Sequence, residues 1–308
     1  MRMIMRILAN DGIDKIAADE LSARGFEIDR GHYGKEELKA QIKDFDVLIV
    51  RSATKVDREI IDAAAQGDLR LIVRAGVGID NIDAAYAQMR GIEVRNTPNA
   101  SSDSVAELVL GHMFSRARFI SIANVTMRDG KWNKKEYEGV ELAGKTLGII
   151  GFGRIGRSLA EKASALGMDV MFHDICVKND EKFEYAEFDA LIKNADFISV
   201  HTPFTGEALI GEAQFRKMKE GVFIINAARG NVIDEKALVD ALNTDRVRGA
   251  GIDVFEKEPA VNLELVRHPK ACVTPHIGAA TREAQMRIGR ETAETVLDFF
   301  DNIIDKAM

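Results

Sequence analysis

The sequence is poor in the residues that mark secreted, disulfide-bonded or membrane-spanning proteins. Of its 308 residues only two are cysteines, Cys176 and Cys272, and they do not form a CxxC pair. Two isolated thiols are typical of a reducing compartment and predict no disulfide framework. No apolar run approaches the ~20 residues that a transmembrane helix needs, and the first residues lack the apolar core and cleavage site of a signal peptide. We therefore expect a cytoplasmic protein that does not insert into a membrane.

Positive charge and metal-binding motifs are scarce as well. Lysine and arginine total 42 against 49 aspartates and glutamates, a net charge of −7. This balance predicts neither a nucleic acid nor a membrane surface as partner. The sequence has no HExxH, no Cys/His cluster and no DxDxDG spacing, so we expect no metal site. It also lacks GxSxG, which disfavours a serine nucleophile. A small molecule is the expected partner.

The sequence does contain a glycine-rich turn between a strand and a helix. An apolar run at Thr146–Ile150 predicts a buried strand, and Gly151, Gly153 and Gly156 follow it with the spacing GxGxxG. Beyond Arg154 the apolar residues recur at helical spacing, so the positive end of a helix should face the turn. Gly151 permits the tight turn, Gly153 lets the backbone approach a pyrophosphate, and Gly156 lets the helix pack closely on the strand. A bare GxGxxG is more often an ordinary turn, but this context predicts a dinucleotide site.

An acidic residue stands where such a site meets the adenosine ribose. The strand predicted at Met168–Phe172 ends near Asp174, roughly the ~20 residues beyond the glycines at which that residue is expected. A carboxylate accepts hydrogen bonds from two ribose hydroxyls and repels a 2′-phosphate. We therefore expect NAD as the cofactor.

The whole chain alternates strands and helices in two successive segments. The first segment has predicted strands at Ile4–Ala9, Phe26–Asp29, Val47–Arg51, Leu71–Arg74 and Ile92–Val94. One long helix from Ser104 to about Met127 then leads to the second segment, which begins near Gly144 and closes with an amphipathic helix over residues 281–305. Later strands are predicted at Phe197–Val200, Val222–Ile225, Gly249–Ile252 and Cys272–Thr274. Short βαβ connections predict two α/β domains, each a doubly wound parallel sheet.

Polar residues follow three of the later strands, at the sheet edge where ligands bind in such folds. Arg229 suits a clamp for a carboxylate or carbonyl oxygen, because its planar fork donates two hydrogen bonds at once. A surface ion pair is the alternative for this residue alone. Asp253 and Glu258 lie in an acidic loop in which one carboxylate can orient an imidazole, or which is simply solvated. His276, between Pro275 and Ile277-Gly278, is placed as an acid/base better than the other five histidines.

Taken in order, these motifs resemble the D-isomer-specific 2-hydroxyacid dehydrogenases. The resemblance is carried by the glycine turn with Asp174, Asn226-Ala-Ala-Arg229-Gly230, Asp253-Val-Phe-x-x-Glu258-Pro259 and Thr274-Pro275-His276-Ile277-Gly278. In the first half, Val50-Arg51-Ser52-Ala53-Thr54 and the stretch from Arg74 to Asp83 look like substrate-side loops. The resemblance implies a flavodoxin-like substrate domain and a Rossmann-like NAD domain with the active site in the cleft between them. It implies domain boundaries of 1–98 with 283–308, and 99–282.

The same resemblance implies roles for individual residues. Arg229 binds the substrate carboxylate and polarises the C2 carbonyl, His276 is the acid/base, and Glu258 keeps His276 protonated. The cofactor-binding residues that it implies are Gly151, Gly153, Arg154, Ile155, Gly156, Asp174, Thr202, Ala227, Ala228, Asp253 and Gly278. The substrate-binding residues are Arg51, Ser52, Arg74, Gly76, Val77, Gly78, Arg229 and His276. Members usually form dimers through the Rossmann-like domain, and the segment around Trp132 lies where that contact is expected.

The substrate is the least constrained expectation. Within the family the chain looks most similar to members that oxidise D-3-phosphoglycerate, in a short form without their regulatory domain. A phosphorylated substrate needs cations, and Arg51 and Arg74 each end a predicted strand, although each can equally form a surface ion pair. A glyoxylate/hydroxypyruvate reductase or a D-lactate-type enzyme is the near alternative. An NAD-sensing corepressor-like protein is the alternative of another class, disfavoured because a sensor does not need Arg229, Glu258 and His276.

Overall fold

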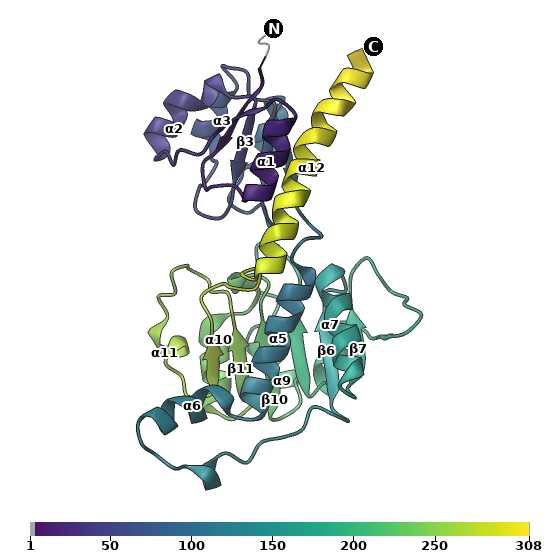
Figure 1. The fold of residues 1–308 in the computed structure, drawn as a ribbon. Coiled ribbons are helices and arrows are strands. Elements are labelled where there is room, and N and C mark those ends of the chain that lie inside the picture. The colour runs from purple at the N-terminus through teal and green to yellow at the C-terminus, as the bar shows by residue number, and fades with distance from the viewer. Residues whose placement is uncertain (1–3, 308) are drawn as a thin grey trace. The chain divides into compact units, whose positions relative to one another are not determined.

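The described part of the chain divides into two compact units. The computed structural model describes residues 4–307; residues 1–3 and 308, which the predicted first domain includes, lie outside the described residues. Unit 1 combines the chain up to Ser101 with the chain from Ala279 onward, and unit 2 is the continuous stretch Ser102–Gly278. Each unit contains one sheet in which every strand pairing is parallel. The α/β fold class with two parallel sheets is therefore confirmed (Figure 1).

Unit 1 is a five-stranded sheet with the strand order β2-β1-β3-β4-β5. This order is that of the flavodoxin-like doubly wound fold. The elements are β1 (Arg6–Ala9), α1 (Lys15–Ala23), β2 (Glu27–Asp29), α2 (Lys35–Gln41), η1 (Ile42–Asp44), β3 (Val47–Val50), α3 (Arg58–Ala64), β4 (Leu71–Arg74), α4 (Ala84–Met89), β5 (Glu93–Asn96) and α12 (Arg282–Ala307).

Alternation along the strands of unit 1 builds a core on both faces of its sheet. In β3, Val47 and Ile49 pack on the face covered by α1 and α12, whereas Leu48 and Val50 pack on the face that carries α2 and α3. All four side chains are fully buried. Because successive side chains point to opposite faces, a strand buried on both sides reads as a continuous apolar run. This explains why the short strands could be predicted.

Unit 2 is a seven-stranded sheet with the order β12-β11-β10-β9-β6-β7-β8. Read from β8 to β6 and then from β9 outward, this is the Rossmann arrangement, in which the order reverses next to the first strand. The elements are α5 (Ser102–Ala117), α6 (Ile120–Arg128), η2 (Lys134–Glu136), β6 (Thr146–Ile150), α7 (Arg154–Ala165), β7 (Asp169–His173), β8 (Glu184–Tyr185), α8 (Phe188–Asn194), β9 (Phe197–Val200), α9 (Glu212–Lys217), β10 (Val222–Asn226), η3 (Gly230–Val232), α10 (Glu235–Asn243), β11 (Val247–Ile252), α11 (Leu263–Val266) and β12 (Ala271–Val273).

The prediction of one continuous helix from Ser104 to Met127 is wrong. The chain instead forms α5 and α6, which are separated at Phe119, where the backbone is left-handed with φ of 57°. The Phe119 ring stacks on Tyr137, with ring centroids 5.6 Å apart. Helix α5 packs on α7 and β11, whereas α6 buries none of its residues, so the core fixes the direction of the first helix only. No glycine or proline marks the break, so the sequence pattern did not reveal it.

The length and composition of the helices can be compared with the prediction that the chain does not insert into a membrane. In residues 4–307, no helix is both long and apolar enough to cross a membrane.

Candidate active site

Three turns of unit 2 follow the neighbouring strands β10, β11 and β12, and they carry Arg229, Glu258 and His276. Because the strands are parallel, their carboxyl ends lie at one edge of the sheet. Gly230 brings two of the turns into contact, since a side chain there would lie 1.8 Å from the Phe255 carbonyl carbon. The three predicted residues therefore occupy adjoining turns at the ligand-binding edge.

Glu258 and His276 form a hydrogen-bonded pair. The carboxylate oxygen Oε2 of Glu258 lies 2.8 Å from Nδ1 of His276. The other oxygen, Oε1, accepts a hydrogen bond from the Phe255 N–H at 3.2 Å, which fixes the carboxylate relative to its own loop. With Nδ1–H donated to a carboxylate, Nε2 is the ring nitrogen left to exchange a proton with a ligand. Both side chains are partly exposed, at 45% for His276 and 39% for Glu258, so a ligand can reach them.

The turn that carries His276 is held by a buried aspartate. His276 has a left-handed backbone with φ of 53°, and its N–H donates to the carbonyl of Asp253 at 2.8 Å. The Asp253 carboxylate, in a residue only 1% exposed, accepts from the Thr274 hydroxyl (2.6 Å) and from the N–H groups of Ile277 and Gly278 (each 2.9 Å). Asp253 therefore binds the chain on both sides of His276.

Thr274 links Asp253 to a buried histidine on α5. The hydroxyl of Thr274, which donates to Asp253, also lies 3.0 Å from Nε2 of His112 on α5. His112 is 2% exposed, so the imidazole packs in the interior and is not available to a ligand. Since the Thr274 hydroxyl donates its one proton to Asp253, Nε2 of His112 is the donor to that hydroxyl.

Arg229 lies in a turn that Asn226 shapes. The buried side chain of Asn226 accepts from the Ala228 N–H at 3.0 Å and donates to the Arg229 carbonyl at 2.9 Å. The Arg229 guanidinium donates to the Ala228 carbonyl at 2.6 Å and is partly buried. Asn226 thus fixes the backbone from which the guanidinium extends.

The glycine turn has the geometry that its spacing predicts. Gly151 has a left-handed φ of 95°, and a side chain there would lie 2.7 Å from the His201 carbonyl oxygen. A side chain at Gly156 would lie 2.3 Å from the Gly151 carbonyl oxygen, so α7 packs directly on the turn. At Gly153, by contrast, a side chain would meet nothing within 4 Å. Gly153 caps α7 without a side-chain hydrogen bond, so the helix N–H groups of Arg154, Ile155 and Gly156 face an open approach, as a pyrophosphate requires.

The polar groups next to the glycine turn also fit a dinucleotide. Asp174 accepts from the N–H groups of Phe152 (2.7 Å), Cys176 (2.8 Å) and Val177 (3.0 Å). Partial burial opposes ionisation, but these three donors outweigh it and hold the pKa of Asp174 below its usual range. The methyl group of Thr202 lies beside Gly151, and its hydroxyl is buried without a partner among the described residues. A buried hydroxyl without a partner is costly unless a ligand satisfies it.

Three further predicted cofactor residues and one histidine lie close to the residues already described. Ala227 and Ala228 lie in the Arg229 turn, and the Gly278 N–H is already bonded to Asp253. Burial lowers the pKa of His201, next to Thr202, to about 4, so its imidazole is neutral near pH 7.

In unit 1 the predicted substrate residues lie in two neighbouring turns. Val50 pairs with Arg74 across β3 and β4, so Arg51 follows directly beside the end of β4. Arg51 and Ser52 are exposed. Arg51 donates from its guanidinium to the neutral amide oxygen of Gln285, and it forms no ion pair within the described chain. The Arg74 guanidinium lies over Gly76, so a Cβ atom at Gly76 would be 1.5 Å from it. Gly76 begins the turn that contains Val77 and Gly78.

Sequence reasoning missed the residues that shape these turns. It assigned no role to Asn226, Thr274, Asp11 or His112. All except His112 lie at or just beyond a strand end, which is the position that singled out Arg229 and His276. Their position at strand ends is therefore a signal in the sequence that could have identified them. Only the contacts in the structure distinguish a residue that holds a turn from one that faces a ligand.

The fold and the site together define a two-unit dehydrogenase with a dinucleotide-binding unit and an Arg–Glu–His set at its ligand edge. The model of the D-isomer specific 2-hydroxyacid dehydrogenase NAD-binding domain matches residues 110–278. The chain belongs to this family, and its cofactor is NAD.

Relatives with different substrates match the chain to a similar degree. The chain is 45% identical to a hydroxypyruvate reductase of Thermotoga maritima over 298 residues, which cover 94% of this chain and 97% of that protein. It is 40% identical to a D-3-phosphoglycerate dehydrogenase of Archaeoglobus fulgidus over 302 residues, which cover 96% of this chain but 57% of that protein. Among solved structures, a glyoxylate reductase of Paecilomyes thermophila superposes with a TM-score of 0.88 at 31% identity, covering 96% and 95% of the two chains.

Proposed function

We propose that this family member oxidises D-3-phosphoglycerate to 3-phosphohydroxypyruvate with NAD, a step toward serine. The observation that carries the phosphate assignment is the charge of Arg51. Its guanidinium is exposed and contacts a neutral amide, with no carboxylate partner among the described residues. The interpretation of Arg51 as half of a surface ion pair therefore fails. An uncompensated guanidinium beside the Arg74 turn suits a phosphate, which accepts two hydrogen bonds from a planar fork.

The residues of unit 2 account for the chemistry at C2 of the substrate. The cofactor, when bound, would supply the hydride acceptor for C2 as NAD and the hydride donor as NADH. The Arg229 guanidinium binds the substrate carboxylate and stabilises negative charge on the C2 oxygen. His276 takes the hydroxyl proton on Nε2 in oxidation and donates it in reduction, while Glu258 accepts from Nδ1–H and fixes the orientation of the imidazole.

The cofactor contacts are proposed for the glycine turn and the groups around it. The N–H groups at the start of α7 would bind the pyrophosphate, and the Asp174 carboxylate would accept from the adenosine ribose. Thr202, Ala227 and Ala228 would line the cofactor. Asp253 and Gly278 would lie at its nicotinamide end, where their mutual hydrogen bond holds the His276 turn.

Hydroxypyruvate reduction is the second candidate. It is favoured by the relative from Thermotoga maritima, which the chain matches over 97% of that protein at 45% identity. Hydroxypyruvate is the expected product without its phosphate, so Arg229, Glu258 and His276 serve both reactions equally. The two candidates differ only in the demand on Arg51 and Arg74.

A comparison of the two keto acids tests this assignment. Initial rates of NADH oxidation are measured with 3-phosphohydroxypyruvate and with hydroxypyruvate. We expect a higher kcat/KM for the phosphorylated acid, and a loss of about 100-fold for that acid alone in Arg51→Ala, as when a charged partner of an anion is removed. Arg24→Ala is the control, because Arg24 is an exposed residue of unit 1 paired with Asp301. Equal kcat/KM for the two acids in the wild-type enzyme would establish the second candidate instead.

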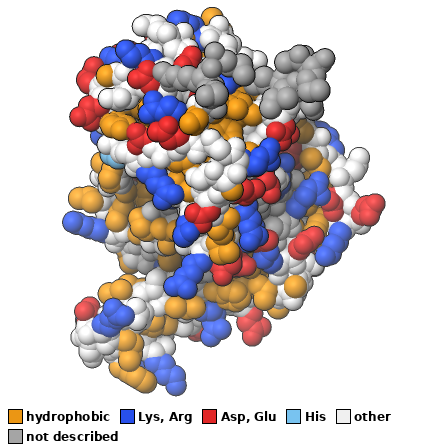
Figure 2. All heavy atoms as spheres, turned by 45° about the horizontal axis from the view of Figure 1, so that its top comes forward, with side chains coloured by type: hydrophobic (Ala, Val, Ile, Leu, Met, Phe, Trp, Pro, Cys, Tyr) orange, Lys and Arg blue, Asp and Glu red, His pale blue; other side chains and the backbone are white. Residues whose placement is uncertain are grey.

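We also propose a homodimer formed through the segment from α6 to η2. Helix α6 buries none of its residues, and Ile120, Val125 and Met127 are each more than half exposed. Trp132, which follows α6, is 77% exposed. The segment extends away from the rest of unit 2, and hydrophobic side chains lie on its surface (Figures 1 and 2). Exposed apolar side chains in one segment are typical of an interaction surface.

Sedimentation velocity tests the dimer. Wild-type protein should sediment as a dimer, whereas Trp132→Glu with Met127→Glu should sediment as a folded monomer with an unchanged circular dichroism spectrum. A monomeric wild-type protein at micromolar concentration would refute the assignment.

A further inference from the structure

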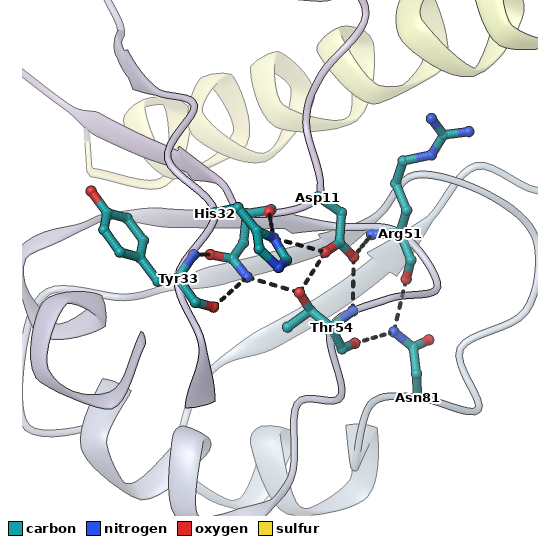
Figure 3. A network of polar contacts seen from close by, with 7 residues as sticks. Asp11, His32, Tyr33, Arg51, Thr54 and Asn81 are labelled. Carbon is teal, nitrogen blue, oxygen red and sulfur yellow. Dashed lines mark hydrogen bonds and ion pairs between the residues drawn. The ribbon is translucent and has the colours of Figure 1, made fainter. Parts of the chain in front are cut away.

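The turn that carries Arg51 is held by side chains from two other loops of unit 1. Asp11, which follows β1, accepts from the N–H groups of Arg51 (2.7 Å) and Thr54 (3.0 Å) and from the Thr54 hydroxyl (2.6 Å). Asn81 donates to the carbonyl oxygens of Arg51 (2.8 Å) and Thr54 (2.7 Å). Figure 3 shows both side chains directed at the turn. Both ends of the turn are therefore fixed by side chains from outside it.

The Asp11 carboxylate is inaccessible to a ligand. Its side chain is 3% exposed, and Asn10, also buried, donates to the Thr54 hydroxyl at 2.8 Å. The Thr54 hydroxyl therefore accepts from Asn10 and donates its proton to Asp11, and these roles cannot be exchanged. On the other side, Nδ1 of His32 donates to the Asn10 carbonyl at 2.7 Å and lies 3.9 Å from Asp11 (Figure 3). Any effect of Asp11 on a substrate must act through the turn.

The first three residues of the turn are open to solvent and the last is not. Arg51, Ser52 and Ala53 are exposed, whereas Thr54 is buried. Fixing the backbone of Arg51 fixes the point from which its guanidinium extends, and it leaves less conformational entropy to lose when an anion binds. A looser turn would keep the same charge but spread it over many positions.

We propose that Asp11 is a positioning residue for the anionic group of the substrate remote from C2: it holds the Arg51 turn in the conformation that binds this group. The proposal rests on the proposed function of Arg51. It predicts that Asp11 determines discrimination between phosphorylated and unphosphorylated keto acids, and that it leaves the chemistry at C2 unchanged. Asp11 is not a catalytic residue, since it touches neither substrate nor cofactor in this scheme.

The hydrogen-bond pattern identifies a substitution that breaks one contact. Oδ2 of Asp11 receives the two N–H groups, and Oδ1 receives the Thr54 hydroxyl. In Asp11→Asn the amide oxygen can keep the two N–H donors, but the NH₂ group cannot accept the proton of the Thr54 hydroxyl, which loses its acceptor. Thr54→Val removes the same contact from the other side, with almost no change in volume. Thr54→Ser retains the hydroxyl and is the conservative variant.

Steady-state kinetics of the full-length enzyme with the two keto acids test the proposal. For Asp11→Asn and Thr54→Val we expect KM for 3-phosphohydroxypyruvate to rise about tenfold, because the binding group is displaced while its charge remains. The kcat for that acid, and kcat/KM for hydroxypyruvate, should stay within about twofold of wild type, because the groups that act at C2 are untouched. Thr54→Ser should restore the wild-type KM.

Asp14→Ala separates positioning from a general loss of stability. The Asp14 side chain caps α1 by accepting from the Ile16 N–H, so this variant should lower the melting temperature without raising KM for either acid. A parallel fall of kcat/KM for both acids in Thr54→Val would overturn the proposal, and so would an unchanged phosphate preference in Asp11→Asn. Failure of the proposed function is recognised separately, because the wild-type enzyme would then show no phosphate preference at all.

Discussion

The turn that carries Arg51 in unit 1 and the turn that carries His276 in unit 2 are built with the same chemistry. In each, a buried aspartate beyond a neighbouring strand accepts two backbone N–H groups and one threonine hydroxyl. Asp11 uses Arg51, Thr54 and the Thr54 hydroxyl, and Asp253 uses Ile277, Gly278 and the Thr274 hydroxyl. Each turn therefore presents a cationic or protonatable side chain on a backbone fixed by hydrogen bonds rather than by sheet pairing.

The two turns differ in strain. Among the described residues, His276 is one of three non-glycine residues with a left-handed backbone, and no residue of the Arg51 turn is among them. Such a conformation costs on the order of 1 kcal/mol or more and persists only where the surroundings enforce it. Asp253, with Thr274 and His112 behind it, supplies that enforcement.

The two turns also differ in the partner of the functional side chain. His276 is paired with the carboxylate of Glu258, whereas Arg51 contacts the neutral amide of Gln285. A group that exchanges a proton needs a partner to fix its tautomer and charge. A group that binds an anion is stronger without a competing carboxylate. The comparison suggests that His276 is placed for reaction and Arg51 for binding, and the following predictions test this division.

Substitution of His276 should have the largest effect. His276→Ala removes the group proposed to exchange the proton at C2, so kcat should fall by about 10²–10⁴-fold. Binding of NAD, followed by quenching of protein fluorescence, should change little, because the glycine turn and Asp174 are untouched. Unchanged turnover of every tested 2-keto acid would contradict the assignment of His276 as the acid/base.

Much of the fold and of the candidate site could be predicted from the sequence, and the part that could not be predicted has a physical cause. The apolar runs and the GxGxxG spacing are local patterns, so they identified the two sheets, the glycine turn, Asp174 and the strand-end residues Arg229 and His276. The break at Phe119 and the contacts of Asp11, Asn226 and Thr274 depend on side chains far apart in the sequence, which no local period records. Thr54 and Asp11 are separated by 43 residues, and His112 and Thr274 by 162.

A matched pair of threonine substitutions should separate the two turns. Thr274→Val removes the hydroxyl that joins Asp253 to His112, so His276 is less well held and kcat should fall about tenfold with KM for the keto acid nearly constant. Thr54→Val should do the reverse, raising KM for the phosphorylated acid with kcat nearly constant.

The serine variants are the controls for this pair, because Thr274→Ser and Thr54→Ser retain the hydroxyls. Both should behave like wild type within about twofold in kcat and KM. If Thr274→Val and Thr54→Val changed the same kinetic constant, the division between a reacting turn and a binding turn would be incorrect.

The smallest expected effect concerns Cys272, which precedes the His276 turn on β12 and has no counterpart beside the Arg51 turn. Burial raises the pKa of this thiol, but the neighbouring polar side chains of His112 and Ser115 outweigh burial and lower the pKa to about 7. Because the thiolate is the reactive form, alkylation by iodoacetamide should reach half its limiting rate near pH 7, whereas an ordinary thiol does so near about pH 8.5. Mass spectrometry of the Cys272 peptide over pH 6–9 measures this rate.

In His112→Gln the midpoint of alkylation should move to higher pH, since the imidazole that favours the thiolate is gone. The same variant should weaken the support of Thr274 and lower kcat slightly. A midpoint that stayed near pH 7 in His112→Gln would show that His112 does not lower the pKa of the thiol, and an unchanged kcat in that variant would remove His112 from the group of side chains that hold the His276 turn.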